Sequence, residues 1–266
     1  MKVNKYLKVL SRIIKMSFMK TMMYRSDFLF GTLTTMLWLL MQIFFTILLF
    51  GTSQVKTIGG LTQNQMLFGL WFMEMLTMPF FFFVIRNVRN IMKGVNEGKL
   101  DFFFLKPLNT SFNILLQEVD ASGAHVILFY TIIGIVIFCL APQEFLDWRK
   151  ILLGIYVYVT SGIIQYALFV IVASLNFYSQ NFLGGWWLMV NSQDLQRYPR
   201  QIYPAFIQIF LTTIFPIFLI INPIFNIMTQ TFDLQLGLHI ALVALIFTII
   251  ARTIWLNGLR RYESAN

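Results

Sequence analysis

Long apolar runs, each about the length of a membrane-spanning helix, recur along this chain and restrict its fold more than any other feature. A span needs about 20 mostly apolar residues, because a helix rises about 1.5 Å per residue and the hydrocarbon layer is about 30 Å thick. The segments that meet or approach this length are residues 28–50, 65–85, 125–141, 151–175, 204–221 and 236–256. We therefore predict an all-α membrane protein with six transmembrane helices, which form a single domain over residues 28–266.

The overall composition agrees with this class of protein. Hydrophobic residues make up 58% of the 266 residues and charged residues only 12%, whereas soluble domains contain about 25% charged residues. The formal net charge is +9, but the charged residues lie between the apolar segments instead of forming the basic face that nucleic-acid binding requires. We expect membrane lipids as partners and no nucleic acid.

Basic residues are concentrated in alternate connections between the predicted spans. Short loops rich in lysine and arginine stay in the cytoplasm. If both termini are cytoplasmic, all but three of the 20 basic residues lie on that side, including Arg197 and Arg200 between spans four and five. The three exceptions are Lys56, Arg149 and Lys150. We predict a multi-pass protein of the cell membrane whose N- and C-termini are cytoplasmic.

Pro216 and Pro223 interrupt the apolar run that begins near Pro204. A proline removes a backbone N–H and kinks a helix, and lipid offers no replacement hydrogen-bond partner. We expect one span over residues 204–221, followed by a proline-broken re-entrant segment. The stretch Gly185–Pro204 is expected to lie at the membrane interface, because its aromatic and basic side chains prefer that depth.

Two basic stretches have the apolar periodicity of amphipathic helices. In residues 1–27, apolar residues such as Tyr6, Leu7 and Leu10 alternate with lysines, which predicts a helix in the cytoplasmic membrane interface. In the cytoplasmic loop 86–120, apolar residues recur at i, i+3, i+4 and i+7, and Gly98 is expected to end that helix. These apolar residues are Val88, Ile91, Met92 and Val95.

A short apolar cluster follows this second helix within the same loop. It consists of Phe102, Phe103, Phe104 and Leu105, and it stands between Asp101 and Lys106 outside every predicted span. An apolar patch on the cytoplasmic side is typical of a docking surface for a soluble partner. The alternative is that the cluster lies under the helix bundle at the lipid interface.

No motif for covalent chemistry is present in the sequence. The chain has no GxxxxGK[ST] phosphate loop, no HExxH zinc motif and no GxSxG nucleophile elbow. Its two histidines, His125 and His239, are far apart in the chain. We predict no catalytic residue, no metal site and no cofactor in this chain.

Three polar side chains inside the predicted spans are the candidate functional residues. A charged group in hydrocarbon costs at least about 2.5–3.5 kcal/mol, so an ionisable residue there is a functional hypothesis. Glu74 is the clearest, and Gln42 and Gln165 are its polar companions. Glu74 is open to three interpretations: it lines a translocation path, it pairs with a partner subunit, or it stays protonated against a hydroxyl group.

These features together resemble the type-2 ABC transporter permeases, in particular short bacterial permeases without a fused ATPase domain. The most specific parts are "GKLDFFFLKPL" at Gly98–Leu108 and "WLNGLRRY" at Trp255–Tyr262. The resemblance implies a pair of permeases, identical or related, each contacted by a separate ATPase subunit that binds ATP and Mg²⁺. It also implies an ATPase-coupling element in the loop after span two. The residues that this element would contain are Val88, Ile91, Met92, Val95, Leu100, Phe102, Phe103, Phe104 and Leu105.

The functional hypothesis is a permease subunit of an ATP-driven exporter for an amphiphilic or lipid-like substrate. Gln42, Glu74 and Gln165 are then possible residues of the translocation path. The alternative is a secondary, proton-coupled transporter that uses Glu74 as its proton carrier. That alternative predicts internal inverted repeats, and the sequence shows no convincing one.

Overall fold

The computed structural model describes residues 2–52, 56–101, 118–119, 124–140, 147–179 and 182–262. This part of the chain is mainly helical and contains no β-strand apart from an isolated bridge between Ile58 and Leu61. The prediction of an all-α protein is therefore confirmed. The predicted cluster Phe102–Leu105 lies outside the described residues.

The structure consists of α-helices joined by short π- and 3₁₀-helical turns. In chain order these are α1 (Lys2–Met23), α2 (Arg25–Thr52), α3 (Gln63–Phe80), the π-helix η1 (Phe81–Ile85), α4 (Arg86–Asn96), α7 (Ala124–Leu140), α9 (Trp148–Leu175), α10 (Leu183–Ser192), the 3₁₀ turns η3 (Gln193–Arg197) and η4 (Arg200–Ile202), α11 (Ala205–Thr213), α12 (Phe218–Met228) and α13 (Leu234–Arg261).

Four of the described helical segments are long and apolar enough to cross a membrane. They are Arg25–Gly51, Gln63–Asn96, Trp148–Leu175 and Leu234–Arg261. A fifth is obtained if α11 and α12, which meet at 110°, are counted as one broken span. The total of six transmembrane spans stays a prediction, because α7 and α10 are shorter than 18 residues.

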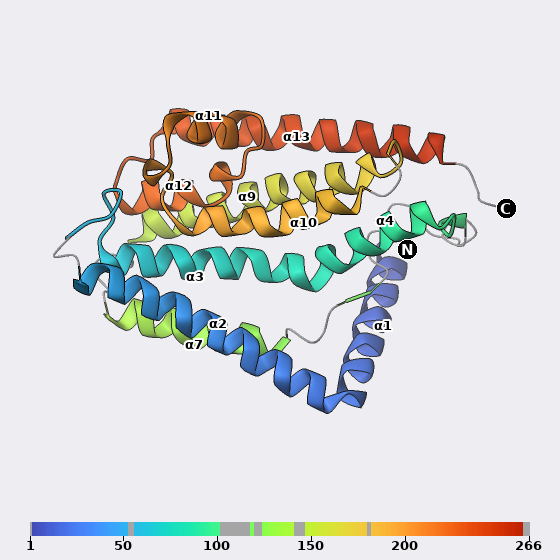
Figure 1. The fold of residues 1–266 in the computed structure, drawn as a ribbon, viewed down its shortest axis with the longest axis horizontal. Coiled ribbons are helices and arrows are strands. Elements are labelled where there is room, and N and C mark those ends of the chain that lie inside the picture. The colour runs from blue at the N-terminus through green and yellow to red at the C-terminus, as the bar shows by residue number, and fades with distance from the viewer. Residues whose placement is uncertain are drawn as a thin grey trace.

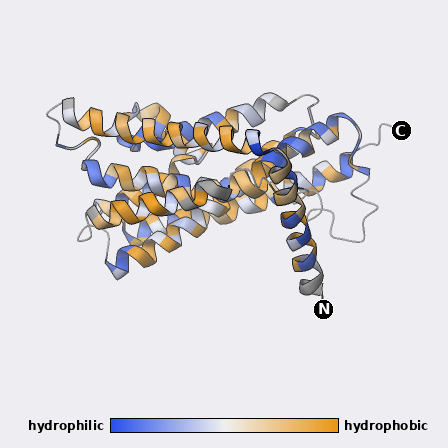
Figure 2. Cartoon of the chain, turned by 90° about the horizontal axis from the view of Figure 1, so that it is seen from below, coloured by the Kyte–Doolittle hydropathy of each residue, from blue (hydrophilic) through white to orange (hydrophobic). Residues whose placement is uncertain are grey.

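The long helices lie side by side along the molecule, and α1 turns away from them (Figure 1). The N-terminus, α4 and the C-terminus lie at one end of this bundle, and the α2–α3 connection, α11 and α12 lie at the other. Figure 2 shows that the bundle is mainly hydrophobic along its length, whereas hydrophilic residues recur in α1. Both termini and the basic helix α4 therefore share one end of the molecule.

The straight helix expected over residues 204–221 is not present. The chain forms α11, breaks at Phe215 and Pro216, and turns back through α12. Pro216 has no N–H to continue the hydrogen bonds of α11, which accounts for the break. All residues of α12 except Asn226 are buried, so protein atoms surround this bent segment, as irregular backbone at membrane depth requires.

The stretch Gly185–Pro204, which was predicted to lie at the membrane interface, is partly helical and partly buried. Its first part, residues 185–192, belongs to α10, which packs against α9 and buries Met189 completely. The stretch then reaches the α2–α3 connection, where a side chain at Gly59 would meet the Pro199 ring at 2.7 Å. Arg200 therefore lies towards the end opposite the termini, whereas Arg197 lies beside Trp38 inside the bundle. The prediction that both lie on the same side as the termini does not agree with these positions. Hydropathy did not reveal α10, because only ten residues separate Phe182 from the polar run that begins at Gln193.

Close contacts fix α3 between its neighbours. A Cβ atom at Gly134 of α7 would lie 2.6 Å from the Trp71 ring, and one at Gly69 would lie 2.0 Å from the Phe225 ring of α12. The Trp71 indole N–H also donates to the backbone carbonyl of Tyr130 in α7 at 2.8 Å. These contacts hold the polar residues of α3 and α7 in a defined relative position.

Candidate functional site

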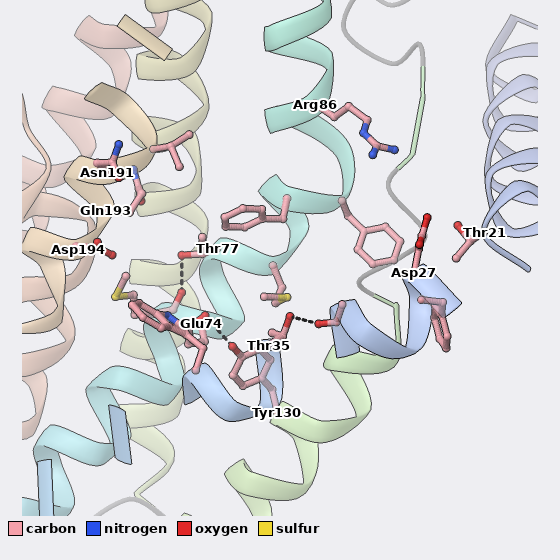
Figure 3. A pocket seen from close by; sticks show the side chains of 18 of the residues that line it. Thr21, Asp27, Thr35, Glu74, Thr77, Arg86, Tyr130, Asn191, Gln193 and Asp194 are labelled. Carbon is pink, nitrogen blue, oxygen red and sulfur yellow. Dashed lines mark hydrogen bonds between the residues drawn. The ribbon is translucent and has the colours of Figure 1, made fainter. Parts of the chain in front are cut away.

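A cavity of about 650 Å³ opens inside the helix bundle. Its walls come from the α1–α2 junction, α2, α3, η1, α7, α10 and η3 (Figure 3). Aromatic side chains form much of the wall, including Trp38, Phe81 and Phe82. The volume lies within the range of about 300–1,000 Å³ that is usual for small-molecule sites.

Glu74 of α3 lies at this cavity with its side chain 8% exposed. The Tyr130 hydroxyl from α7 donates a hydrogen bond to the Glu74 Oε2 atom at 2.9 Å (Figure 3). Gln42 of α2 is next to Glu74, and both polar atoms of its amide are buried without a hydrogen-bond partner among the described residues. Two of the three predicted path residues are therefore close together.

Asp194 and Arg197 of η3 face the same cavity as an ion pair. The Arg197 Nη2 atom is 2.7 Å from the Asp194 Oδ1 atom. The guanidinium carbon also lies 5.0 Å from the centre of the Trp38 ring in α2, which is a favourable cation–π distance. The wall near Glu74 thus contains a balanced pair of charges and an aromatic ring that already accepts a cation.

Gln165 does not line the cavity but is connected to it through Gln193. The Nε2 atoms of Gln165 and Gln196 donate to the Gln193 Oε1 atom at 3.1 and 2.9 Å. Gln165 and Gln196 are completely buried, and their own amide oxygens have no partner within the described chain. Gln193 itself lines the cavity. A row of amides therefore runs from the interior of α9 to the cavity wall.

The wall formed by α3 and η1 is shaped by Pro79. A proline within a helix leaves the carbonyl four residues earlier without its usual donor. Here that carbonyl belongs to Met75, and the Tyr158 hydroxyl from α9 donates to it at 3.2 Å. The helix then widens into the π-helical segment η1, which brings Phe81 and Phe82 to the cavity. Such single π turns are frequent at functional sites.

The apolar face of α4 points into the bundle and not towards a partner. Val88, Ile91, Met92 and Leu100 are completely buried, and Val95 packs against the same core. The exposed residues of α4 are instead basic: Arg86, Arg89 and Lys93. The predicted coupling residues of this helix therefore contribute to the protein core, and a partner would contact its basic face. Burial could not be distinguished from docking in the sequence, because both require the same apolar periodicity.

Hydrogen bonds to distant parts of the chain hold both ends of α4. The Asn87 side chain exchanges hydrogen bonds with the backbone of Glu118 at 2.7 and 3.0 Å. Asn176, at the end of α9, donates to the Met92 carbonyl at 2.7 Å and to the Asn96 side chain at 2.8 Å. The position of α4 is therefore fixed by α9 and by the segment before α7.

Gly98 ends α4, as expected, and the chain beyond it contacts the C-terminal motif. Gly98 has a φ of +64°, and the Lys99 N–H donates to the Gly94 carbonyl at 2.9 Å, a common glycine-dependent helix end. The Leu100 N–H then donates to the Tyr262 hydroxyl at 3.1 Å. The two sequence motifs "GKLDFFFLKPL" and "WLNGLRRY" are therefore in direct contact.

Two ionisable groups near the end of α4, Glu97 and Tyr262, have pKa values that their immediate surroundings shift. Lys99 donates to the exposed Glu97 carboxylate at 2.6 Å and lowers the pKa of that group. Burial raises the pKa of Tyr262, whose hydroxyl oxygen accepts the Leu100 hydrogen bond.

Several cavity residues were not predicted from the sequence. Tyr130 is one aromatic residue in an apolar run, and no local pattern distinguishes it. Asp194 and Arg197 are separated by three positions, the spacing of a helical ion pair, and this signal was missed because the stretch was interpreted as interfacial. Among the described residues, no group of three or more His, Cys, Asp or Glu side chains is arranged to hold a metal ion.

Comparison with protein-family models gives a match to the ABC-2 family transporter protein over residues 36–266. This match includes the cavity helices, α4 and the C-terminal motif. The chain belongs to the ABC-2 transporter family. Comparison with curated proteins and with solved structures gives no match.

Membership of the ABC-2 family has consequences for the general class of this protein. ABC-2 membrane proteins are the permease components of ABC transporters, and they are generally not catalytic themselves. Together with several long apolar helices, this makes the chain a multi-pass membrane protein of the transport type. The family in general associates with an ABC ATPase.

Proposed function

We propose that the chain is the permease subunit of an ATP-driven exporter for an amphiphilic or lipid-like substrate. The observation that carries the proposal is the cavity of about 650 Å³ inside an ABC-2 permease. Its wall combines aromatic side chains with buried polar groups such as Glu74 and Gln193. A substrate with an apolar part and a polar part fits such a lining, because each part finds matching groups.

A second permease, identical or related, completes the transporter in this proposal. The helix α2 supports it, because only 11% of its apolar segment is buried within the chain. Its exposed apolar residues include Leu33, Leu37 and Phe44. Since α2 also forms one wall of the cavity, a second permease along α2 would enclose the substrate between two subunits.

A separate ATPase, which binds ATP and Mg²⁺, supplies the energy in this proposal. It contacts the cytoplasmic end of the molecule, where the exposed basic face of α4 and the cluster Phe102–Leu105 would form the joint. Two observations support this location. Hydrogen bonds to the Glu118 backbone and from the Asn176 side chain hold α4 at both of its ends, and the Leu100–Tyr262 hydrogen bond connects the chain after α4 with the end of α13. Movement of α4 would therefore be transmitted to both α9 and α13.

The substitution Phe103→Asp tests the coupling role of the cluster. It places an unpaired charge in a contact that excludes water, which costs several kcal/mol, so the permease should lose the ATPase or the ATPase should lose its response to substrate. The measurement is co-purification of the two subunits, followed by substrate-stimulated ATP hydrolysis. Phe103→Leu is the control, because it keeps the site apolar. Wild-type values for Phe103→Asp would contradict the coupling role.

Glu74 also supports a second candidate function, a proton-coupled secondary transporter. A buried carboxylate at a cavity, with the Tyr130 hydroxyl as its neighbour, is the arrangement that a proton carrier needs. Transport into liposomes that is driven by a proton gradient, without any ATPase, would favour this candidate. The family match makes the ATP-driven permease the stronger proposal.

A further inference from the structure

The Glu74 carboxylate has no ion-pair partner within the described part of the chain. Its carboxylate accepts a hydrogen bond from Tyr130, but no lysine or arginine in the described part of the chain forms an ion pair with it. Arg197, the basic residue of the neighbouring wall, is already paired with Asp194 at 2.7 Å. A carboxylate in the interior of a membrane protein is costly unless a counter-charge is nearby. Glu74 therefore has no counter-ion in direct contact within the described chain, although Arg197 is close enough to act on it electrostatically.

The aromatic lining of the cavity also suits a cation. Trp38, Phe81 and Phe82 line it together with Tyr130, and aromatic faces attract ammonium and guanidinium groups. The contact of Arg197 with the Trp38 ring at 5.0 Å shows that a cation is accommodated at this wall. Gln42, whose buried amide makes no hydrogen bond among the described residues, offers a further polar group beside Glu74.

The other basic residues of the cavity lie at a different depth. Lys20 belongs to the end of α1, and Arg86 follows η1. At a rise of about 1.5 Å per residue, Arg86 is about 18 Å from Glu74 along the helix, and Figure 3 shows the two residues well separated. These basic groups therefore do not neutralise Glu74, and the region around Glu74 disfavours an anion.

We propose that the cavity binds the cationic headgroup of an amphiphile, with Glu74 as the counter-ion and the aromatic wall around it. The amphiphile is a substrate of the transporter, so this inference rests on the proposed function and specifies its substrate class. The apolar tail contacts the remaining wall, which includes Met73 and Met78. Anionic amphiphiles of the same length bind more weakly, because they bring a second negative charge to Glu74.

Equilibrium binding to the purified protein in lipid nanodiscs tests this proposal. The probes share one alkyl chain and differ in headgroup: a radiolabelled alkyltrimethylammonium, and the alkyl glucoside and alkyl sulfate as competitors, all below their micelle concentrations. The trimethylammonium probe should bind about tenfold or more tighter than the sulfate, since like charges are disfavoured at such a site. Equal competition by the alkyl sulfate would overturn the proposal.

The substitution Glu74→Gln tests the role of the carboxylate itself. Glutamine has nearly the same shape, and its carbonyl still accepts the Tyr130 hydrogen bond, so the fold is retained. The affinity for the trimethylammonium probe should fall about tenfold, while glucoside binding stays the same. Glu97→Gln is the matched control, because it removes an equal charge outside the cavity. Wild-type affinity of Glu74→Gln for the cation would overturn the proposal.

The test of the substrate class and the test of the proposed function give independent results. Binding of the probes requires no ATPase, whereas the proposed function is tested by ATPase association. A permease that associates with its ATPase but shows no preference for cationic amphiphiles would refute only the substrate class. A protein that prefers the cation but never associates with an ATPase would refute only the ATP-driven function.

Discussion

Glycine residues determine how closely α3 approaches its neighbours. Gly69 faces the Phe225 ring of α12, and Gly134 of α7 faces the Trp71 ring of α3. Small residues at such contacts let helices pack closely inside a membrane, where the hydrophobic effect does not drive association. The contact between Gly134 and Trp71 positions Glu74 and Tyr130 relative to each other, because both residues belong to the same two helices, α3 and α7.

The substitution Gly69→Ala should destabilise the protein. A Cβ atom there would lie 2.0 Å from Phe225, so the buried ring must move, and such overpacking costs about 1–3 kcal/mol. Thermal unfolding of the purified protein in detergent measures the effect. Gly162→Ala is the control, because a Cβ atom at Gly162 has no neighbour within 4 Å. If the two variants unfold at the same temperature, the close contact between α3 and α12 is incorrect.

At the scale of helices, the sequence predicted those elements that are apolar over their whole length. The helices α2, α9 and α13 each have 28 residues and include the segments 28–50, 151–175 and 236–256. Their identification required only hydropathy, because a long apolar helix is the usual solution in lipid. In contrast, α10 could not be predicted, since its apolar part is short and Gln193 and Asp194 follow it directly.

The candidate site was predictable only in part for a similar reason. Glu74 and Gln42 could be identified, because a polar residue within an apolar run is conspicuous in a sequence. The sequence did not identify their partner Tyr130 or the pair Asp194–Arg197. Tertiary contacts of α7, α10 and η3 bring these residues to the cavity. The burial of the apolar α4 side chains could not be predicted, because one apolar face can serve either a core or a partner.

The missing helix donor at Pro79 leads to a prediction about the contact between α3 and α9. The substitution Tyr158→Phe removes the donor to the Met75 carbonyl and should cost about 1 kcal/mol. Pro79→Ala restores an N–H that can donate to the same carbonyl. In the Pro79→Ala background, Tyr158→Phe should therefore cost much less, and a double-mutant cycle of unfolding free energies in detergent reports the difference. Strictly additive costs would show that the Tyr158 hydroxyl does not replace the missing helix donor.

At the scale of the whole molecule, the parts of the proposed mechanism lie at different depths. The cavity with Glu74 is inside the bundle, whereas α4 and the two termini share one end of it. The α3–η1–α4 segment runs through both regions as one continuous helical stretch, Gln63–Asn96. Movement of α4 by an ATPase would therefore be transmitted directly to the wall that carries Glu74, Phe81 and Phe82. This continuity connects the family assignment with the proposed substrate site.

The most direct test of the central proposal is reconstitution of the chain in liposomes with and without an ABC ATPase expressed beside it. The readout is movement of an alkyltrimethylammonium amphiphile across the membrane. The proposed permease should retain the ATPase during purification and move the amphiphile only when both ATPase and ATP are present. Transport by the chain alone, driven by a proton gradient and independent of ATP, would contradict the proposal and identify a secondary transporter instead.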